Sequence, residues 1–337
     1  MIVLGIETSC DETSAAVVKD GNLLSNIIAT QPVHAQWGGV VPELASRAHL
    51  LKIMPVVDEA MQQSGYKLNA IDAIAFTQGP GLLGALMVGA TYAKGLAIAL
   101  HKPLVAVHHM QAHILAHFIK PPFPAFPFLC LTVSGGHTQL VLVKNFTEME
   151  ILGETIDDAA GEAFDKAAKM LGLPYPGGPF IDAYAKNGNA DAFIFAKPHI
   201  SGFNYSFSGL KTSILYFLRE KTNDNPDFIQ ANLADLCASI QKTITAILLK
   251  KMQQAAKQFQ ISNLALAGGV SANSYLRNAF HLMGEKNNWT THIPEFAFCT
   301  DNAAMIAIAG YYKLKAGKQS PLSVMPRARI PGLETID

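Results

Sequence analysis

One strand–loop–strand pattern occurs twice in the chain, on either side of its strongest break. An apolar strand, a loop of small and polar residues and an alternating strand occupy residues 2–20 and return at residues 128–143. Between them lies the proline-rich segment PPFPAFP at residues 121–127. Prolines interrupt regular structure, so this segment predicts a domain boundary. The duplication, with further strands alternating with helices, predicts two α/β lobes with mixed sheets.

The length of 337 residues exceeds that of one ordinary core and supports this division. We expect an N-terminal domain over residues 1–122, completed by a C-terminal helix over residues 303–337. The second domain is expected over residues 123–302. Half of the residues are apolar and 15% are charged, which is typical of a compact, well-buried protein.

Charge and cysteine usage limit the classes of function. Lys plus Arg and Asp plus Glu both number 26, so no global positive field attracts nucleic acid, and any RNA contact needs a local patch or a partner protein. The four cysteines are widely spaced and form no CxxC pair, which favours a reducing compartment. The N-terminal apolar run lacks a basic region and is interrupted by Glu7, so we expect a first strand, no signal peptide and a cytoplasmic protein.

The apolar segment at residues 81–100 is long enough to be considered as a membrane span. Lys94 and several glycines interrupt it, and the turn-forming pair Gly79-Pro80 precedes it. These features favour a buried helix whose small residues permit close packing, and we expect no membrane contact. Such a helix surface is also a candidate for docking a partner protein.

Three loops rich in Gly, Ser and Thr follow apolar strands, at residues 7–14, 133–139 and 267–273. Clustered backbone N–H groups in such loops bind anions, and glycine lets a ligand approach the backbone closely. None of the loops matches the P-loop or the GxGxxG motif, and each alone is more typical of a tight turn. Together, in a chain with two lobes, they favour a nucleotide cleft.

The stretch VHHMQAH, residues 107–113, places His109 and His113 four residues apart on an expected helix. Both side chains can therefore bind one metal ion, although a pair of buried or capping histidines is the alternative. His117 repeats the spacing but lies about 12 Å from His109 at 1.5 Å rise per residue, too far to share the ion. His109 adjoins the end of a strand, where α/β folds bind ligands, which favours the first pair.

A zinc-protease reading of this stretch lacks its catalytic base. The HExxH motif needs a glutamate directly after the first histidine, and that position is Met110. The next residue, Gln111, is a neutral amide and cannot replace the base. The sequence therefore disfavours a metallopeptidase.

Several long motifs occur in the order typical of one known family. They resemble the TsaD family of tRNA-adenosine threonylcarbamoyltransferases over nearly the whole chain. The resemblance implies the two-lobed fold of actin, Hsp70 and sugar kinases (the ASKHA superfamily), with a nucleotide between the lobes. The motifs are GIETSCDETS, GGVVPELASRAH, GPGLLGALMVGA, VHHMQAH, VSGGHTQL, DDAAGEAFDKAAKMLGLPYPGGP, YSFSGLKT, AGGVSAN and FCTDNAAMIA.

The resemblance also implies a metal centre formed by His109, His113 and Asp301. It implies one divalent ion per subunit, with Fe²⁺ favoured and Zn²⁺ possible, and three N/O ligands leave positions open for catalysis. Without the resemblance, Thr300, Asp301 or Asn302 could simply cap the helix that follows. Many relatives read HMEGH where this chain has Gln111-Ala112, which spares the ligands and puts in doubt any role for a carboxylate on that turn.

Nine substrate-binding residues follow from the same resemblance. Backbone amides of a Ser-Gly-Gly turn can contact phosphate or carboxylate oxygens, aspartates can accept from ribose hydroxyls, and an asparagine can bond to a nucleotide edge. Tight turns, solvated carboxylates and an asparagine near a helix start are the alternatives. The residues are Thr132, Val133, Ser134, Gly135, Gly136, Asp165, Gly178, Asp182 and Asn273.

Two acidic residues of the first loop, Asp11 and Glu12, are candidate catalytic groups. Facing the ligand, they could orient a metal-bound water or accept a proton from an attacking amine. An exposed acidic turn is the alternative. Lys211 is a candidate contact for phosphate or RNA, and a simple surface lysine is the commoner case.

By resemblance, the reaction moves a threonylcarbamoyl group from threonylcarbamoyl-AMP to the N6 amine of the adenosine next to a tRNA anticodon, releasing AMP. The tRNAs concerned read codons that begin with adenine. The implied partners are a TsaB-like paralogue, a TsaE-like ATPase and, upstream, a TsaC-type donor synthase. The alternatives are a non-catalytic nucleotide-binding scaffold subunit and an actin-like ATPase or kinase.

Overall fold

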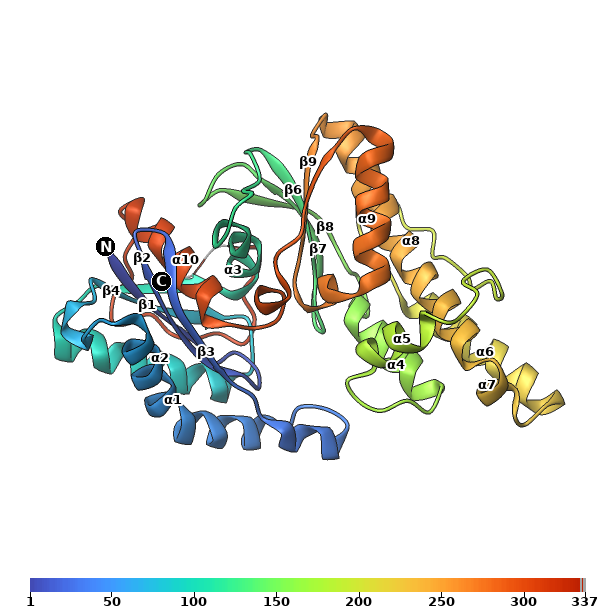
Figure 1. The fold of residues 1–337 in the computed structure, drawn as a ribbon, viewed down its shortest axis with the longest axis horizontal. Helices are drawn as coiled ribbons and strands as arrows, with labels where there is room; N and C mark the ends of the chain where they lie inside the picture. The colour runs from blue at the N-terminus through green and yellow to red at the C-terminus, as the bar shows by residue number, and fades with distance from the viewer. Residues whose placement is uncertain (334, 336–337) are drawn as a thin grey trace. The chain divides into compact units, whose positions relative to one another are not determined.

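The chain divides into two compact units (Figure 1). The structure is a computed structural model that describes residues 1–333 and Thr335, except for the side chain of Ala35. Unit 1 comprises Met1–Pro124, Val143–Glu150 and Pro294–Asp337, and unit 2 comprises Ala125–Leu142 and Ile151–Ile293.

This division differs from the sequence expectation near the C-terminus. Residues 294–302 belong to unit 1 because the helix that follows them is anchored there: the backbone N–H of Ala303 donates to Ser14 Oγ at 2.9 Å. The helix expected over residues 303–337 ends at Lys315. Gly317 has a φ of +76°, which terminates the helix, and the chain beyond it returns to the sheet, where Ser320 N donates to the Leu104 carbonyl at 2.8 Å.

Unit 1 is built on a five-stranded mixed sheet in the order β3-β2-β1-β4-β5. Strand β1 pairs antiparallel with β2 and parallel with β4, and β4 pairs parallel with β5. The strands are β1 (Ile2–Glu7), β2 (Thr13–Lys19), β3 (Asn22–Ala29), β4 (Ala73–Gly79) and β5 (Leu104–His108). The helices are α1 (Pro42–Ser64), α2 (Leu83–Leu100), α3 (His109–Leu115) and α10 (Ala303–Lys315), with short 3-10 turns at Pro32–Trp37, Leu68–Ala70, Ala116–Phe118 and Phe296–Phe298.

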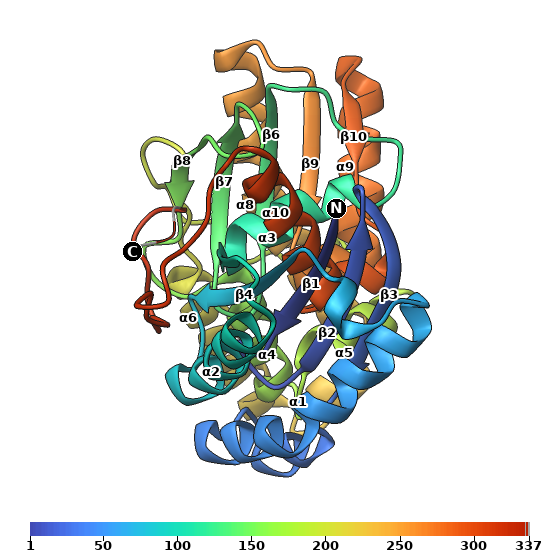
Figure 2. The same cartoon turned by 90° about the vertical axis from the view of Figure 1, so that its left-hand side faces the viewer.

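Alternating side chains of β1 face two different helical layers. Ile2, Leu4 and Ile6 pack into the core with apolar residues of α1 and α2. Gly5 faces the opposite way, where α10 packs so closely that a Cβ would lie 2.6 Å from the Ala303 carbonyl oxygen. Figures 1 and 2 show α1 and α2 along one face of the sheet and α10 with α3 along the other. By the same alternation, Glu7 at the end of β1 lies on the side of α10 and α3.

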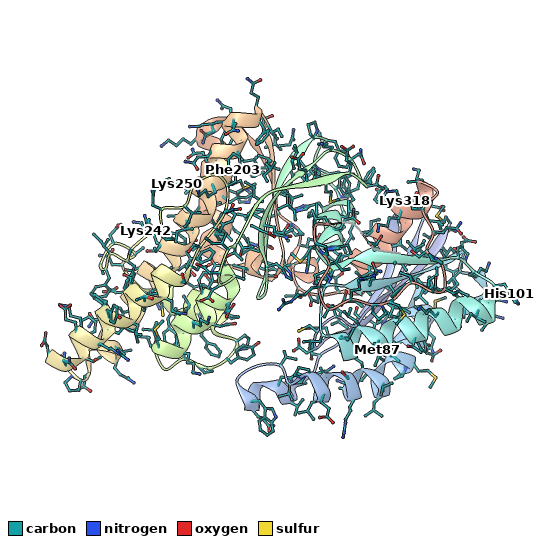
Figure 3. All side chains as sticks on the ribbon, turned by 180° about the vertical axis from the view of Figure 1, so that it is seen from behind. Met87, His101, Phe203, Lys242, Lys250 and Lys318 are labelled. Carbon is teal, nitrogen blue, oxygen red and sulfur yellow. The ribbon has the colours of Figure 1, made fainter. Side chains whose placement is uncertain are left out.

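Helix α2 buries the face that carries its small residues, as the sequence predicted, and leaves its other face exposed. Its composition is apolar all round, so size rather than polarity distinguishes the faces. The buried face has a small residue every four positions: Ala85, Gly89, Ala93 and Ala97. Large residues on the other face are 49%, 48% and 57% exposed: Leu83, Met87 (labelled in Figure 3) and Ile98. Among the described residues α2 is the helix long and apolar enough to cross a membrane, and its small-residue face packs on the sheet of unit 1.

Unit 2 is built on a second five-stranded sheet, in the order β10-β9-β6-β7-β8. The strands are β6 (Phe128–Val133), β7 (Thr138–Val143), β8 (Met149–Glu154), β9 (Asn263–Ala267) and β10 (Thr290–His292). The helices are α4 (Ala160–Met170), α5 (Gly177–Ala185), α6 (Ser208–Asp224), α7 (Phe228–Ala231), α8 (Leu233–Phe259) and α9 (Ser274–Asn287), with a 3-10 turn at Gly269–Ala272.

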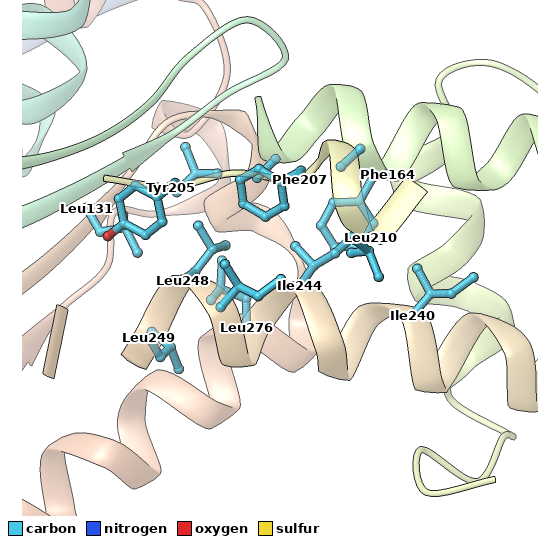
Figure 4. Close-up of a cluster of buried hydrophobic side chains, with 14 of the residues drawn as sticks. Leu131, Phe164, Tyr205, Phe207, Leu210, Ile240, Ile244, Leu248, Leu249 and Leu276 are labelled. Atoms are coloured by element: carbon cyan, nitrogen blue, oxygen red, sulfur yellow. The ribbon is translucent and has the colours of Figure 1, made fainter. Parts of the chain in front are cut away.

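The core of unit 2 surrounds the long helix α8. Ile244 and Leu248 of α8 are fully buried and pack with Tyr205 and Phe207, which precede α6, in the cluster shown in Figure 4. Read from β8, the strand order of this sheet repeats that of unit 1 read from β3: a three-strand run followed by two strands reached through helices. The duplication expected from the sequence is confirmed.

Replacing Gly5 by alanine tests the contact between β1 and α10. The new Cβ meets backbone atoms of Ala303 and Ala307 at 2.6 Å, which cannot move without shifting the helix. We expect a loss of at least about 2 kcal/mol in the free energy of unfolding, measured with urea. Gly95→Ala in α2 is the matched control: its Cβ meets nothing within 4 Å, and it should stabilise the chain by up to about 1 kcal/mol. Equal effects of the two changes would contradict the packing described.

Candidate metal centre

Helix α3 brings two histidines together directly after β5. His108 is the last residue of the strand and His109 the first of the helix. His109 and His113 are one turn apart and both are buried, at 7% and 1% exposure. Their Nε2 atoms are 3.2 Å apart. The expected pair therefore faces a common point, while His117 lies in the 3-10 turn that follows.

Asp301 joins the two histidines from the loop before α10. The capping role belongs to its neighbour, because Asn302 Oδ1 accepts from Met305 N at 3.0 Å and leaves Asp301 free of the helix. Asp301 Oδ1 lies 3.2 Å from His113 Nε2 and 3.4 Å from His109 Nε2. The structure thus brings together the three residues that the resemblance named.

These three donor atoms fit one divalent ion. They form a nearly regular triangle with sides of 3.2, 3.2 and 3.4 Å. A point about 2.1 Å from each corner, the usual metal–N/O distance, lies roughly 1 Å above the triangle's plane. Two imidazoles and one carboxylate on one side of an ion leave its other positions open, which suits zinc or iron in a catalytic site.

Glu7 supports the centre and is a residue that sequence reasoning did not assign to it. Its side chain is fully buried, and Oε2 lies 3.3 Å from His109 Nδ1. Because a carboxylate accepts, Nδ1 carries the ring proton and donates to Glu7, which directs the Nε2 lone pair toward the metal position. Thr77 Oγ1 and Ser9 N donate to the same carboxylate and hold it in place. The only sequence signal for this role of Glu7 was a single acidic residue at the end of an apolar strand.

Burial and neighbouring charges shift the pKa values of the residues in this cluster in different directions. Burial opposes charge on every member, but the charge of His109 outweighs it at Asp301 and holds the pKa of that carboxyl well below its usual range. In the same way, Asp301 and Glu7 overcome burial and raise the pKa of His109. Burial lowers the pKa of His113. Without a metal ion, the cluster therefore contains two carboxylates, one imidazolium and one neutral imidazole.

The first loop brings Glu12 within electrostatic reach of this cluster. Burial, followed by the negative charges of Asp301 and Asp11, raises the pKa of Glu12 to about 9. Asp11 and Glu12 are both partly buried, which argues against an exposed acidic turn. A cation bound beside Asp301 would offset the contribution of that carboxylate and lower the pKa of Glu12.

Gln111, the departure from the HMEGH pattern, faces away from the ligands. Its side chain is buried and lines a separate cavity of about 290 Å³ in unit 1. Val105 of β5 and Lys313 of α10 line the same cavity. The substitution therefore changes the environment behind α3 and leaves the metal-facing side of that helix intact.

In unit 2, the predicted phosphate-contacting segment forms a tight turn at the end of β6. Thr132 and Val133 are buried in the strand. Ser134 N donates to the His137 carbonyl at 2.8 Å, and His137 N donates to Ser134 Oγ at 3.1 Å, closing the turn. Gly135 is exposed at its tip, as is Gly136.

Two other segments pack closely against this turn, each at a glycine. A Cβ at Gly161, in the first turn of α4, would lie 2.6 Å from the Ser134 carbonyl oxygen. A Cβ at Gly268, which has a φ of +85°, would lie 2.4 Å from the Val133 carbonyl oxygen. The loop after β6, the start of α4 and the loop after β9 therefore meet at one place.

The remaining candidates in unit 2 hold loops together, and none is a freely solvated group. Asp165 Oδ1 accepts from Gly177 N at 2.7 Å, next to Gly178, and burial raises the pKa of this carboxyl. Asp182 Oδ1 accepts from Ser274 Oγ at 2.7 Å.

Asn273 and Lys211 also have partners within unit 2. Asn273 caps α9 by accepting from Leu276 N at 2.9 Å, and its amide donates to Gln241 Oε1 at 2.6 Å. Lys211 lies 3.6 Å from Asp158 in an ion pair.

Comparisons with known proteins agree on one family. The model of the TsaD family, described as tRNA N6-adenosine threonylcarbamoyltransferase, matches residues 22–308. A curated protein of that name from Porphyromonas gingivalis is 58% identical over 335 residues, with 98% of each chain covered. A second, from Cytophaga hutchinsonii, is 55% identical and covers 98% of this chain and 97% of its own.

The solved structure of HypF from T. kodakarensis shares the fold, with a TM-score of 0.65 at 14% identity, over 94% of this chain and 48% of that one. Together with the two mixed five-stranded sheets, this likeness shows the fold of the actin, Hsp70 and sugar-kinase superfamily, as the sequence predicted.

Zinc binding to chelator-stripped protein should tighten as the pH rises. Asp301 and Glu7 raise the pKa of His109, so this ring holds a proton that an incoming ion must displace. Displacing one proton makes the apparent affinity rise about tenfold per pH unit below that pKa. A chelator competition at several pH values measures the slope. His281→Ala, which removes an exposed histidine of α9, should leave it unchanged, and an affinity independent of pH would exclude His109 as a ligand.

Proposed function

The chain belongs to the TsaD family and acts as a tRNA N6-adenosine threonylcarbamoyltransferase, and we propose that its transfer step takes place at a divalent metal ion held by His109, His113 and Asp301. The observation that carries the proposal is the triangle of donor atoms with sides of 3.2–3.4 Å. We infer that the donor is threonylcarbamoyl-AMP, and that the acceptor is the adenosine next to the anticodon in tRNAs that read codons beginning with adenine.

The transfer forms one bond and breaks another. The N6 amine attacks the carbamoyl carbon of the mixed anhydride, the bond from that carbon to the phosphate oxygen breaks, and AMP leaves with the electron pair. When bound, the divalent ion, Fe²⁺ in the favoured case or Zn²⁺, supplies positive charge beside the carbonyl oxygen on which negative charge develops. His109, His113 and Asp301 would hold it, and Glu7 fixes the ring of His109.

The attacking amine must lose a proton, and the first loop supplies candidate acceptors. Burial and nearby carboxylates raise the pKa of Glu12 to about 9, so in the metal-free chain this group is mostly protonated near neutral pH. A cation bound beside Asp301 would lower that pKa and leave a carboxylate that can accept the proton. Asp11 precedes it in the same loop. We assign proton transfer to this pair, with Glu12 as the acceptor and Asp11 supporting its basicity.

We assign the nucleotide contacts to unit 2. The amides of Gly135 and Gly136 sit at the exposed tip of a turn, which suits phosphate oxygens. Asp165 and Asp182 already accept hydrogen bonds, but a carboxylate has about four lone-pair sites and retains capacity for ribose hydroxyls. Asn273 uses its side-chain oxygen as a helix cap, so its contact to a base edge would share that atom.

Two neighbouring helices of unit 1 offer a docking surface for a partner protein. Apolar side chains remain exposed on the outer face of α2 and on α1, against which α2 packs. We propose that a TsaB-like paralogue covers this face, and that a TsaE-like ATPase and a TsaC-type donor synthase complete a cytoplasmic pathway. Equal numbers of basic and acidic residues fit a chain that shares tRNA binding with such partners. The exposed residues are Leu50, Leu51, Met54, Leu83, Met87 and Ile98.

The double variant His109→Ala/His113→Ala should lose bound metal and threonylcarbamoyl transfer while keeping its fold. Wild type and variant are incubated with the partner proteins, threonine, bicarbonate, ATP and unmodified tRNA, and the nucleosides are analysed by mass. Circular dichroism and metal analysis accompany the assay. We expect a loss of at least about 100-fold in transfer rate, because changing only the partners of metal ligands already costs about 10–100-fold.

Full transfer by a folded, metal-free double variant would contradict the metal-assisted mechanism. It would favour the alternative in which this chain binds a nucleotide as a scaffold subunit. ATP hydrolysis without tRNA, at the rate of modification, would favour the ATPase reading instead.

Met87→Glu should break the complex with a TsaB-like partner. A charge on a residue that becomes buried at an interface costs several kcal/mol when unpaired. Leu282→Glu, on α9 of unit 2, is the matched control because Leu282 is 55% exposed and Met87 48%. Size-exclusion chromatography of the mixed proteins reads out the complex. Retention of the complex by Met87→Glu would exclude this face of α2.

A further inference from the structure

A buried histidine of α1 contacts the first loop through both of its ring nitrogens. His49 is 0% exposed and lies on the inner face of the helix. Its Nδ1 is 2.8 Å from Thr13 Oγ1, and its Nε2 is 3.0 Å from the Cys10 carbonyl oxygen. Cys10 lies in the loop between β1 and β2, and Thr13 is the first residue of β2. Through these two contacts His49 holds both ends of the segment that carries the candidate proton acceptors.

These contacts define the protonation of the ring. A carbonyl oxygen only accepts, so Nε2 carries the proton and donates to Cys10. Nδ1 is then the acceptor, and the Thr13 hydroxyl donates to it. Burial lowers the pKa of His49, which agrees with a neutral ring. One neutral tautomer therefore satisfies both partners.

The two anchored residues enclose the acidic pair. Cys10 directly precedes Asp11, and Thr13 directly follows Glu12. The preceding part of the loop is fixed separately, because Thr8 Oγ1 donates to the Ala85 carbonyl at 2.9 Å and Leu82 N donates to the Ser9 carbonyl at 2.7 Å.

The aromatic ring makes histidine suited to this task. Its two nitrogens have a fixed separation, so a single side chain sets the distance between the Cys10 carbonyl and the Thr13 hydroxyl. Asparagine places a polar atom near the position of Nδ1 and glutamine near that of Nε2, and neither reaches both. The conformation of Asp11 and Glu12 therefore depends on a side chain that lies outside the reacting groups.

We propose that His49 is a positioning residue for the transfer reaction, which holds Asp11 and Glu12 at the metal centre by bridging Cys10 and Thr13. The inference rests on the proposed function, since it is the transfer step that needs the acidic pair in place. A displacement of about 1 Å at a reacting group costs up to about 100-fold in rate.

The test compares changes at both ends of the contact. His49→Gln keeps a donor for the Cys10 carbonyl and loses Thr13, whereas Thr13→Val removes the hydroxyl with little change in shape. We expect both to lower kcat for threonylcarbamoyl transfer by about 10-fold or more, with KM for tRNA within about twofold and the metal content unchanged. The conservative Thr13→Ser keeps the hydroxyl and should restore most of kcat. The double variant His49→Gln/Thr13→Val should be no slower than the slower single one, because both remove the same contact.

His34 provides the matched control. It is also buried in unit 1 and uses both nitrogens, with Nε2 2.9 Å from Gln31 Oε1 and Nδ1 accepting from Val41 N at 3.3 Å. It does not contact the acidic loop, so His34→Gln should affect stability and leave kcat of the folded, metal-loaded protein unchanged.

The possible results separate the inference from the function on which it rests. Transfer absent from the wild type, with partners and substrates present, would reject the proposed function. Transfer by the wild type with an unchanged kcat in Thr13→Val, or an equal loss in His34→Gln, would reject the positioning role alone. If His49→Gln fails to fold, the contrast between Thr13→Val and Thr13→Ser decides.

Discussion

The close contact between α10 and the bare backbone of Gly5 determines where the candidate metal centre lies. Any side chain at this position would meet the backbone of Ala303 at 2.6 Å, so only glycine lets the helix lie so near β1. Asp301 stands two residues before Ala303, and its carboxylate reaches the histidines of α3 because the helix is held this close. A packing constraint in the middle of a strand thus sets the geometry of a site at the strand's end.

The charges of the candidate metal centre favour a bound cation. Glu7 and Asp301 are two carboxylates around two imidazoles, and Glu12 lies near enough for Asp301 to raise its pKa. Buried charges are costly unless they are paired. In the metal-free chain, a protonated His109 compensates one of these two carboxylate charges. A divalent ion would compensate both charges and release the proton of His109. The same ion would lower the raised pKa of Glu12, which links metal binding to the ionisation of the candidate proton acceptor.

The sequence predicted the parts of this account that depend on local periodicity. Four-residue spacing offered both His109 with His113 and His113 with His117, and the strand end before His109 favoured the first pair. The repeated strand pattern predicted two related sheets, because that signal lies within short segments. Asp301 and Asn302 are adjacent and both can cap a helix, so only the resemblance named Asp301 as a candidate ligand, and the structure gives the cap to Asn302. Glu7 reaches His109 from about 100 positions away, a long-range contact without a local pattern. The sequence offered α2 as a candidate docking surface, but its apolar composition on all sides did not reveal which of its residues are covered.

X-ray absorption spectroscopy of the metal-loaded protein tests the central claim most directly, since it counts and identifies the ligands of the ion. The account predicts two imidazole nitrogens and at least one carboxylate oxygen, all at about 2.0–2.2 Å for zinc. Cys10 lies in the first loop, and burial raises the pKa of its thiol, so sulfur should be absent from the first coordination sphere. A sulfur ligand at about 2.3 Å, or a number of imidazoles other than two, would contradict the assignment of His109, His113 and Asp301.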